Sequence, residues 1–209
     1  MAMPQGQRPF GVALAGACLL SGCVNIDIDE TDHSALFLDA RVRKGLDGAE
    51  DHSGPHVELG WTSAQGETDA LEYSIGAAFL GMGLEAPLGD QGWVGPVAGI
   101  RWQVNDLDPA LVELDADDGV GPYIALEGGW HATSWLEPYA RAEVALYLNE
   151  YSSTGGFEAG ARLHFIEHTA LFTGWRFAQY NIDDVDSAVG ISKVELDASG
   201  LVLGLDLSF

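Results

Sequence analysis

The residues with the clearest potential for chemistry are histidines that alternate with charged side chains. His164 shares a polar face with Glu158 and Arg162, and His56 shares one with Glu58. A histidine oriented by a carboxylate can act as the general base for a serine nucleophile. The chain has no GxSxG nucleophile elbow, no HExxH motif and no phosphate-binding loop. We therefore assign no catalytic residue and no cofactor, and we expect His164 to be a hydrogen-bonded residue of the interior.

Acidic segments are the second place where chemistry could occur. Asp115, Asp117 and Asp118 lie in a stretch that resembles a fragment of a calcium loop. This stretch lacks the ligand spacing and the distal glutamate of a complete EF-hand loop. The three aspartates are thus candidate ligands for a divalent cation, and the alternative is an acidic loop that is simply solvated. We assign no metal site.

The composition narrows the classes of function. The chain has 209 residues, a formal net charge of -23 and 47% hydrophobic residues. This acidity argues against a nucleic-acid-binding protein, because no basic patch is present to meet phosphates. The hydrophobic content favours one folded domain over disorder. No apolar run after the N-terminal segment approaches the roughly 20 residues of a membrane-spanning helix.

The N-terminal segment has the features of an export signal. Arg8 precedes an apolar run from Phe10 to Leu20, which is too short for a stop-transfer helix. The run ends in Leu20-Ser21-Gly22-Cys23, which resembles the lipobox of bacterial lipoproteins. The resemblance implies that residues 1–22 are removed and that Cys23 is acylated, for example with palmitate. The alternative is an ordinary secretory signal that contains a cysteine at its end.

This resemblance also implies a location. Residues 23–33 would form a lipidated acidic tether, followed by a domain over 34–209. Because Val24 follows the cysteine where inner-membrane lipoproteins have Asp, we expect the Gram-negative outer membrane. The expected partners are the lipid bilayer and lipopolysaccharide. Cations already bridge lipopolysaccharide molecules, so acidic loops are compatible with that surface. Cys18 would be removed with the signal, so the mature chain would have no free thiol.

From Ser34 to Phe209 apolar and polar residues alternate with a period of two, which indicates strands rather than helices. Ten segments show the pattern. In the last one the apolar residues change from even to odd positions near Ser199-Gly200, where we expect a β-bulge. The segments are 34–43, 56–65, 70–82, 93–105, 109–115, 121–131, 135–148, 156–167, 170–181 and 192–209. We predict an all-β fold, an antiparallel up-and-down barrel of ten strands, with eight strands as the alternative.

The connections between these segments alternate in length, which is typical of transmembrane barrels with short periplasmic turns. The short ones are 66–69, 106–108, 132–134 and 168–169, and the longer ones are 44–55, 83–92, 116–120, 149–155 and 182–191. An even number of strands would return the end of the chain to the side of the N-terminal lipid.

Charged residues of the strands fall on the polar faces and do not interrupt the apolar faces. Such sorting fits a narrow barrel whose lumen holds arginine–carboxylate pairs while the apolar faces meet lipid. The expected lumen network comprises Asp39, Arg41, Arg43, Glu58, Glu72, Arg101, Glu127, Arg141, Glu143, Glu158, Arg162, Arg176 and Asp206. Glu113, Glu137 and Glu195 fall on the same polar faces.

Two further features favour lipid on the outside. The segment LVLGLDLSF, which ends in Phe209, resembles the C-terminal signal of outer-membrane barrels. Aromatic residues near strand ends could form interfacial girdles. They are Trp93, Trp130, Trp135, Tyr147, Tyr151 and Tyr180.

We therefore expect a monomeric, lipid-anchored outer-membrane barrel with a filled lumen and a structural or interaction role. Alternation alone does not decide which face of a sheet is inside. One alternative is a soluble, lipocalin-like lipoprotein with an apolar lumen that binds a hydrophobic ligand. Another is a barrel enzyme that modifies envelope lipids, although the chain carries no active-site pattern of such enzymes.

Overall fold

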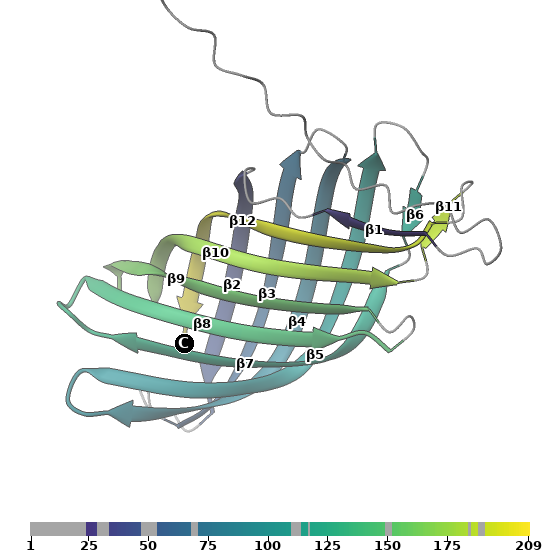
Figure 1. The fold of residues 1–209 in the computed structure, drawn as a ribbon. Helices are drawn as coiled ribbons and strands as arrows, with labels where there is room; N and C mark the ends of the chain where they lie inside the picture. Colours follow the sequence, from purple (N-terminus) through teal and green to yellow (C-terminus); the bar gives the residue numbers. More distant parts are fainter. Residues whose placement is uncertain are drawn as a thin grey trace, which may run out of the picture.

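Nine strands close into one barrel in the computed structural model, and no helix occurs in the described residues (Figure 1). In Figure 1 one wall of the barrel crosses in front of the other at a steep angle. The structure describes residues 24–28, 34–46, 54–67, 71–109, 114–116, 118–148, 152–183, 185–187 and 191–209.

Each barrel strand pairs antiparallel with the next one along the chain. The last strand then pairs with the first in parallel, with Ser199 opposite Ser34 and Ser208 opposite Arg43. The strands are β2 (Ser34–Gly45), β3 (Gly54–Glu67), β4 (Leu71–Leu88), β5 (Gly92–Pro109), β7 (Gly119–Trp130), β8 (Leu136–Leu146), β9 (Ser153–Ile166), β10 (Thr169–Asp183) and β12 (Ile191–Ser208). The barrel is therefore mixed, and the expectation of a wholly antiparallel barrel was wrong at this one seam.

The predicted strand number was also wrong, because segment 109–115 is not a barrel strand. Strand β5 continues to Pro109, whose missing N–H suits the end of a strand. Residues Leu114–Ala116 form β6, which pairs with β11 (Val185–Ser187) in a separate two-stranded sheet. The alternative of eight strands fails as well, since nine strands surround the lumen.

An odd strand number places the two ends of the barrel chain on opposite rims. We name the rims the Ser34 end, where β2 begins, and the Phe209 end, where β12 finishes. The predicted return to the starting side is thus wrong. The Ser34 end has connections 68–70, 110–118, 147–152 and 184–190, and the Phe209 end has 46–53, 89–91, 131–135 and 167–168. The long 46–53 connection therefore shares a rim with short turns, contrary to the strict alternation expected.

Strand β1 (Val24–Ile28) lies in parallel beside the first part of β12, with Val24 opposite Ile191. It thus occupies the same side of β12 as β2, but further toward the tip of the Ser34 end. The expected bulge near Ser199-Gly200 is absent, since β12 keeps one uninterrupted register against β10.

Glycines on the inner face make room for aromatic rings on neighbouring strands. Gly60 lies opposite Phe79, and a Cβ atom on Gly60 would lie 2.2 Å from the ring carbon Cζ of Phe79. Gly204 stands in the same relation to Phe172. Close packing of the lumen therefore accounts for some of the 27 glycines of the chain.

The described residues contain no helix of the length and hydropathy needed to cross a bilayer.

Candidate functional site in the barrel interior

The lumen is filled by a network of buried arginines and carboxylates. All six arginines of the strands point inward and are at most 8% exposed. They face eight carboxylates on the same inner surface: Asp39, Glu58, Glu85, Glu127, Glu137, Glu143, Glu158 and Asp206. Alternation positions these side chains, because every second residue of a strand faces the lumen.

Glu127 is the centre of one half of this network. Nη1 of Arg141 donates to its Oε2 at 2.8 Å, and Nη2 of Arg43 donates to its Oε1 at 3.2 Å. Arg162 donates to the same carboxylate, and Nη1 of Arg41 lies 3.8 Å from it. One carboxylate is therefore shared by guanidinium groups from β2, β8 and β9.

Glu158 and Asp39 form the centre of the other half. Nε of Arg176 donates to Oε2 of Glu158 at 2.8 Å, and Nη1 of Arg176 donates to Oδ1 of Asp39 at 3.0 Å. Arg41 donates to both carboxylates, and the hydroxyl of Tyr139 donates to Glu158. These contacts connect β2 with β9 and β10 across the seam strand β12.

Aromatic rings of the lumen lie against several of the guanidinium groups. The guanidinium carbon of Arg162 lies 4.4 Å from the ring centre of Tyr139, and that of Arg41 lies 4.7 Å from that of Phe172. Trp93 lies beneath Arg43 and Arg162. Cation–π contacts of this kind stabilise buried arginines in addition to their ion pairs.

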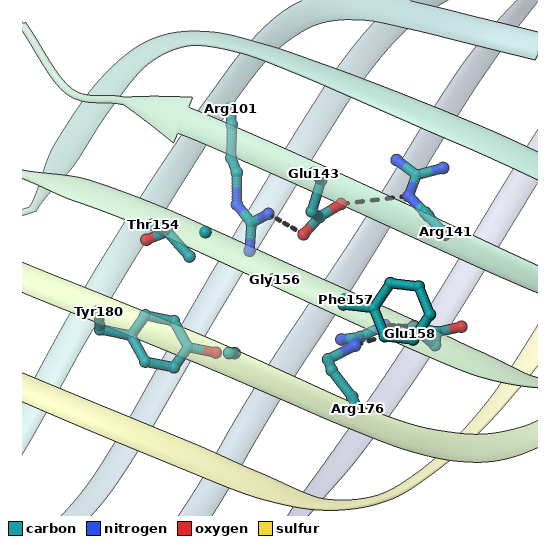
Figure 2. A pocket seen from close by; sticks show the side chains of 11 residues that line it. Arg101, Arg141, Glu143, Thr154, Gly156, Phe157, Glu158, Arg176 and Tyr180 are labelled. Atoms are coloured by element: carbon teal, nitrogen blue, oxygen red, sulfur yellow. Dashed lines mark hydrogen bonds and ion pairs between the residues drawn. The ribbon is translucent and has the colours of Figure 1, made fainter. Parts of the chain in front are cut away.

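One small pocket of the interior is lined by charged groups (Figure 2). Nη1 of Arg101 donates to Oε1 of Glu143 at 2.5 Å, and Nε of Arg141 donates to its Oε2 at 3.1 Å. Arg176 and Tyr180 complete the wall. A second small pocket lies near the Phe209 end, between Arg43, Arg162 and His164. Neither pocket is an apolar cavity.

His164 contacts a carboxylate, but the partner is Glu137 rather than Glu158. Nε2 of His164 lies 3.4 Å from Oε2 of Glu137, and Nδ1 of His131 lies 3.1 Å from the same oxygen. Nη1 of Arg162 donates to the other oxygen of Glu137 at 2.7 Å. The described residues form no hydrogen bond between His164 and a serine, so this cluster has the geometry of a charge cluster and not of a nucleophile with its base.

The structure brings twelve of the thirteen expected network residues into the lumen. Glu72 is the exception, because it is exposed on the outer face of β4, where Tyr73 and Ile75 point inward. The sequence assigned the faces of this strand the wrong way round. Glu195 also lies on the outer face, and Glu113 is outside the described residues.

Several interior residues were missed from the expected network. Glu85 lies beyond the predicted end of its strand, so the alternation pattern did not include it. In the structure it accepts a hydrogen bond from Nη1 of Arg43 at 2.6 Å. The hydroxyl of Tyr123 donates to Glu58 at 2.9 Å, and that of Tyr147 donates to Gln103 at 2.8 Å. The even–odd pattern of the longer strand β4 is the signal that could have identified Glu85.

The expected aromatic girdle is only partly present. Trp130 and Trp135 are exposed at the Phe209 end, whereas Trp93, Tyr147 and Tyr180 are buried in the lumen. The Tyr147 hydroxyl and the Trp93 ring contact the inner network instead, which a count of aromatic residues near strand ends does not reveal. Tyr151 lies outside the described residues.

Two other expected sites are the lipidation site at Cys23 and the candidate cation ligands Asp115, Asp117 and Asp118. Cys23 and Asp117 lie outside the described residues. Asp115 pairs with Asp186 in the β6–β11 sheet, and Asp118 is exposed. No group of three His, Cys, Asp or Glu in the described part of the chain is arranged to hold a metal ion.

The outer surface of the barrel carries a continuous zone without charge, which we name the apolar belt. Its outward residues lie in 36–42, 57–61, 78–88, 94–104, 120–130, 136–146, 157–165, 171–177 and 201–209. Thr173 is the one polar side chain among them. Ile100, Met82 and Ile124 are each more than 60% exposed, which is unusual for large apolar residues in water.

Beyond the belt, at the Ser34 end, the two faces exchange character. Outward residues there are polar or charged, and inward residues are apolar. On β12 Glu195 and Asp197 point outward while Val194 and Leu196 are fully buried. We name this part the extension: it comprises the outer parts of β3, β4, β5, β10 and β12 at residues 65–67, 71–74, 106–108, 179–183 and 193–199.

Comparison with known proteins gives no match, because no family model, curated protein or solved structure is significantly similar to the chain.

Proposed function

We propose that the protein is a lipid-anchored outer-membrane β-barrel with a closed lumen and a structural or interaction role. The observation that carries this proposal is the apolar belt, which surrounds the barrel without a charged residue. A soluble monomer rarely exposes a contiguous apolar patch of more than a few hundred Å². A hydrocarbon environment removes the cost of exposing this belt.

The height of the belt supports the same conclusion. Residues 94–104 of β5 would span about 25 Å along the membrane normal, at the rise and tilt usual for such strands. This is the height of the apolar band of outer-membrane barrels. The exchange of faces in the extension is then expected, since a strand that leaves the bilayer meets water on its outside.

The filled lumen supports a role other than bulk transport. Arginine–carboxylate pairs cross the interior at Glu127 and at Glu158, so no open channel runs between the rims through the described residues. A narrow barrel of this kind is wide enough for side chains to fill it. Passive passage of solutes is therefore not part of the proposed function.

The soluble, ligand-binding alternative has less support. It requires an apolar lumen, but the inner face within the belt carries the arginines. The enzymatic alternative gains no support from His164, whose charged neighbour is Glu137 and which forms no hydrogen bond to a serine in the described part of the chain. For these reasons we do not advance either as a second candidate.

The test is the behaviour of a Cys23→Ser variant, which carries no lipid. We expect it to resist carbonate extraction from outer membranes and to migrate differently on SDS gels with and without boiling. The matched control is the wild-type chain, in which the lipid and the barrel both hold the protein. A Cys23→Ser protein that is monomeric and soluble without detergent would overturn the proposal.

A further inference from the structure

We propose that the two rims of the barrel take different positions relative to the bilayer; this inference rests on the proposed membrane function. The Phe209 end would be embedded to its rim, while the Ser34 end would project into water on the outer side of the membrane. The lipid on Cys23 would then enter the leaflet on the side of the Ser34 end. The start and the end of the barrel chain would face opposite compartments.

The parallel pairing of β2 with β12 fixes the separation of the two chain ends. Both strands run from the Ser34 end to the Phe209 end, with Ser34 opposite Ser199 and Arg43 opposite Ser208. In a barrel that spans a bilayer, Ser34 and Phe209 cannot lie on the same side. Strand β1 keeps Val24 at the Ser34 end as well, so the residue after Cys23 belongs to that side.

The two rims differ in how they would meet a bilayer. At the Phe209 end Lys44 is the charged outward residue on β2, and the outward residues of the other strands stay apolar to the last turns, with Leu88, Phe165 and Ile166 all more than 60% exposed. Trp130 and Trp135 are exposed at this rim, where indole rings favour the membrane interface.

At the Ser34 end the strands continue past the belt with a water-compatible surface. Glu72, Asp106 and Asp108 are exposed there, and the interior is filled by apolar side chains such as Ile75, Ile182 and Leu196. This arrangement of polar outside and apolar inside is that of a soluble protein. The extension therefore stands outside the hydrocarbon.

The lengths of the connections assign the sides. In bacterial outer-membrane barrels the short turns are periplasmic and the longer loops are extracellular. Residues 89–91, 131–135 and 167–168 connect strands at the Phe209 end, and 46–53 is the single longer connection there. The Ser34 end has the longer connections 110–118, 147–152 and 184–190, and 68–70 is its single short one. The Ser34 end is therefore assigned to the cell exterior.

Single cysteines test this orientation, because a mature chain acylated at Cys23 has no other thiol. Glu72→Cys and Asp108→Cys report on the extension, and Asp90→Cys and Glu167→Cys report on the Phe209 end. Each variant is treated with a membrane-impermeant maleimide in intact Gram-negative cells and again after the outer membrane is permeabilised. The parent chain, without an added cysteine, gives the background.

We expect the two extension variants to be labelled in intact cells. The two Phe209-end variants should gain at least tenfold in labelling after permeabilisation. The reverse pattern would overturn the orientation but leave a spanning barrel in place. Equal labelling of all four variants, before or after permeabilisation, would mean that both rims face one compartment, which would overturn the membrane-spanning function itself.

Discussion

Arg141 and Glu127 are direct cross-strand partners on β8 and β7, and Nη1 of Arg141 donates to Oε2 of Glu127 at 2.8 Å. The same guanidinium group reaches across the lumen, where its Nη2 donates to Oε1 of Glu58 at 3.1 Å. One residue thus joins a neighbouring strand to the opposite wall. Ion pairs of this kind connect strands that are not neighbours in the sheet.

Glu127→Gln should strongly destabilise the barrel, because it leaves the guanidinium groups around Glu127 without their shared charge. Removing one partner of a buried ion pair typically costs about 3–5 kcal/mol. The temperature at which the compact band on an unboiled SDS gel disappears should fall accordingly. Glu72→Gln removes the same charge from the exposed outer face and should change stability by less than about 0.5 kcal/mol. Equal effects of the two substitutions would show that the lumen network does not stabilise the barrel.

Ile100→Arg should destabilise the inserted barrel, because Ile100 is 61% exposed in the middle of the belt. An arginine on the lipid face near the bilayer centre costs about 2–4 kcal/mol. Asp108→Arg lies on the same face of β5 but in the extension, so it should have little effect. Denaturant unfolding in lipid vesicles measures both. If Ile100→Arg is as stable as Asp108→Arg, the belt does not contact hydrocarbon.

Gly60→Ala should destabilise the barrel by about 1–3 kcal/mol, the range for overpacking an interior. The added Cβ would lie 2.2 Å from Cζ of Phe79, whose ring must then move. Gly155→Ala is the matched control, because no atom lies within 4 Å of its added Cβ. Thermal unfolding followed by circular dichroism compares the two. A similar loss in both variants would point to a backbone effect of glycine and not to the Phe79 contact.

Lipid insertion should release β1 from β12. While Val24 is paired with Ile191, it lies on the order of 30 Å along β12 from Leu201, where the belt begins. An acyl chain on the adjacent Cys23 reaches the bilayer when this pairing opens. We expect fast hydrogen exchange at residues 24–28 in the lipidated protein and slower exchange in Cys23→Ser, both in vesicles. Equal protection in the two forms would contradict the release of β1.

Much of the barrel could be predicted from alternation alone. The even positions of 36–42 are exposed and the odd ones are buried, as the pattern indicates, and Arg101, Arg141 and Arg176 point inward. These features depend on the two-residue period of a strand, which is local in the sequence. The charge sorting that motivates the membrane proposal is therefore readable without coordinates.

Alternation gave the wrong prediction where the outer face of a strand changes from apolar to polar along its length. Glu72 was expected inside because the polar face of 70–82 was assigned to the lumen, whereas the side chains of the opposing apolar face, such as Tyr73 at 4% exposed, point inward and Glu72 points outward. Near Ser199-Gly200 the same change was taken for a bulge. A change of surroundings and a change of register look alike in a sequence, since both exchange apolar and polar positions.

The sequence by itself determined the all-β class, and it placed the strand arginines on one face and the uncharged residues of the belt on the other, because each follows from side-chain polarity at neighbouring positions. Which of the two faces lines the lumen was decided by the closure of the barrel. Only the tertiary structure decided the number of strands, the parallel seam between Ser34 and Ser199, and the partners of Glu127. Those depend on contacts between segments far apart in the chain. Such contacts are set by barrel closure and lumen packing, for which no local pattern exists.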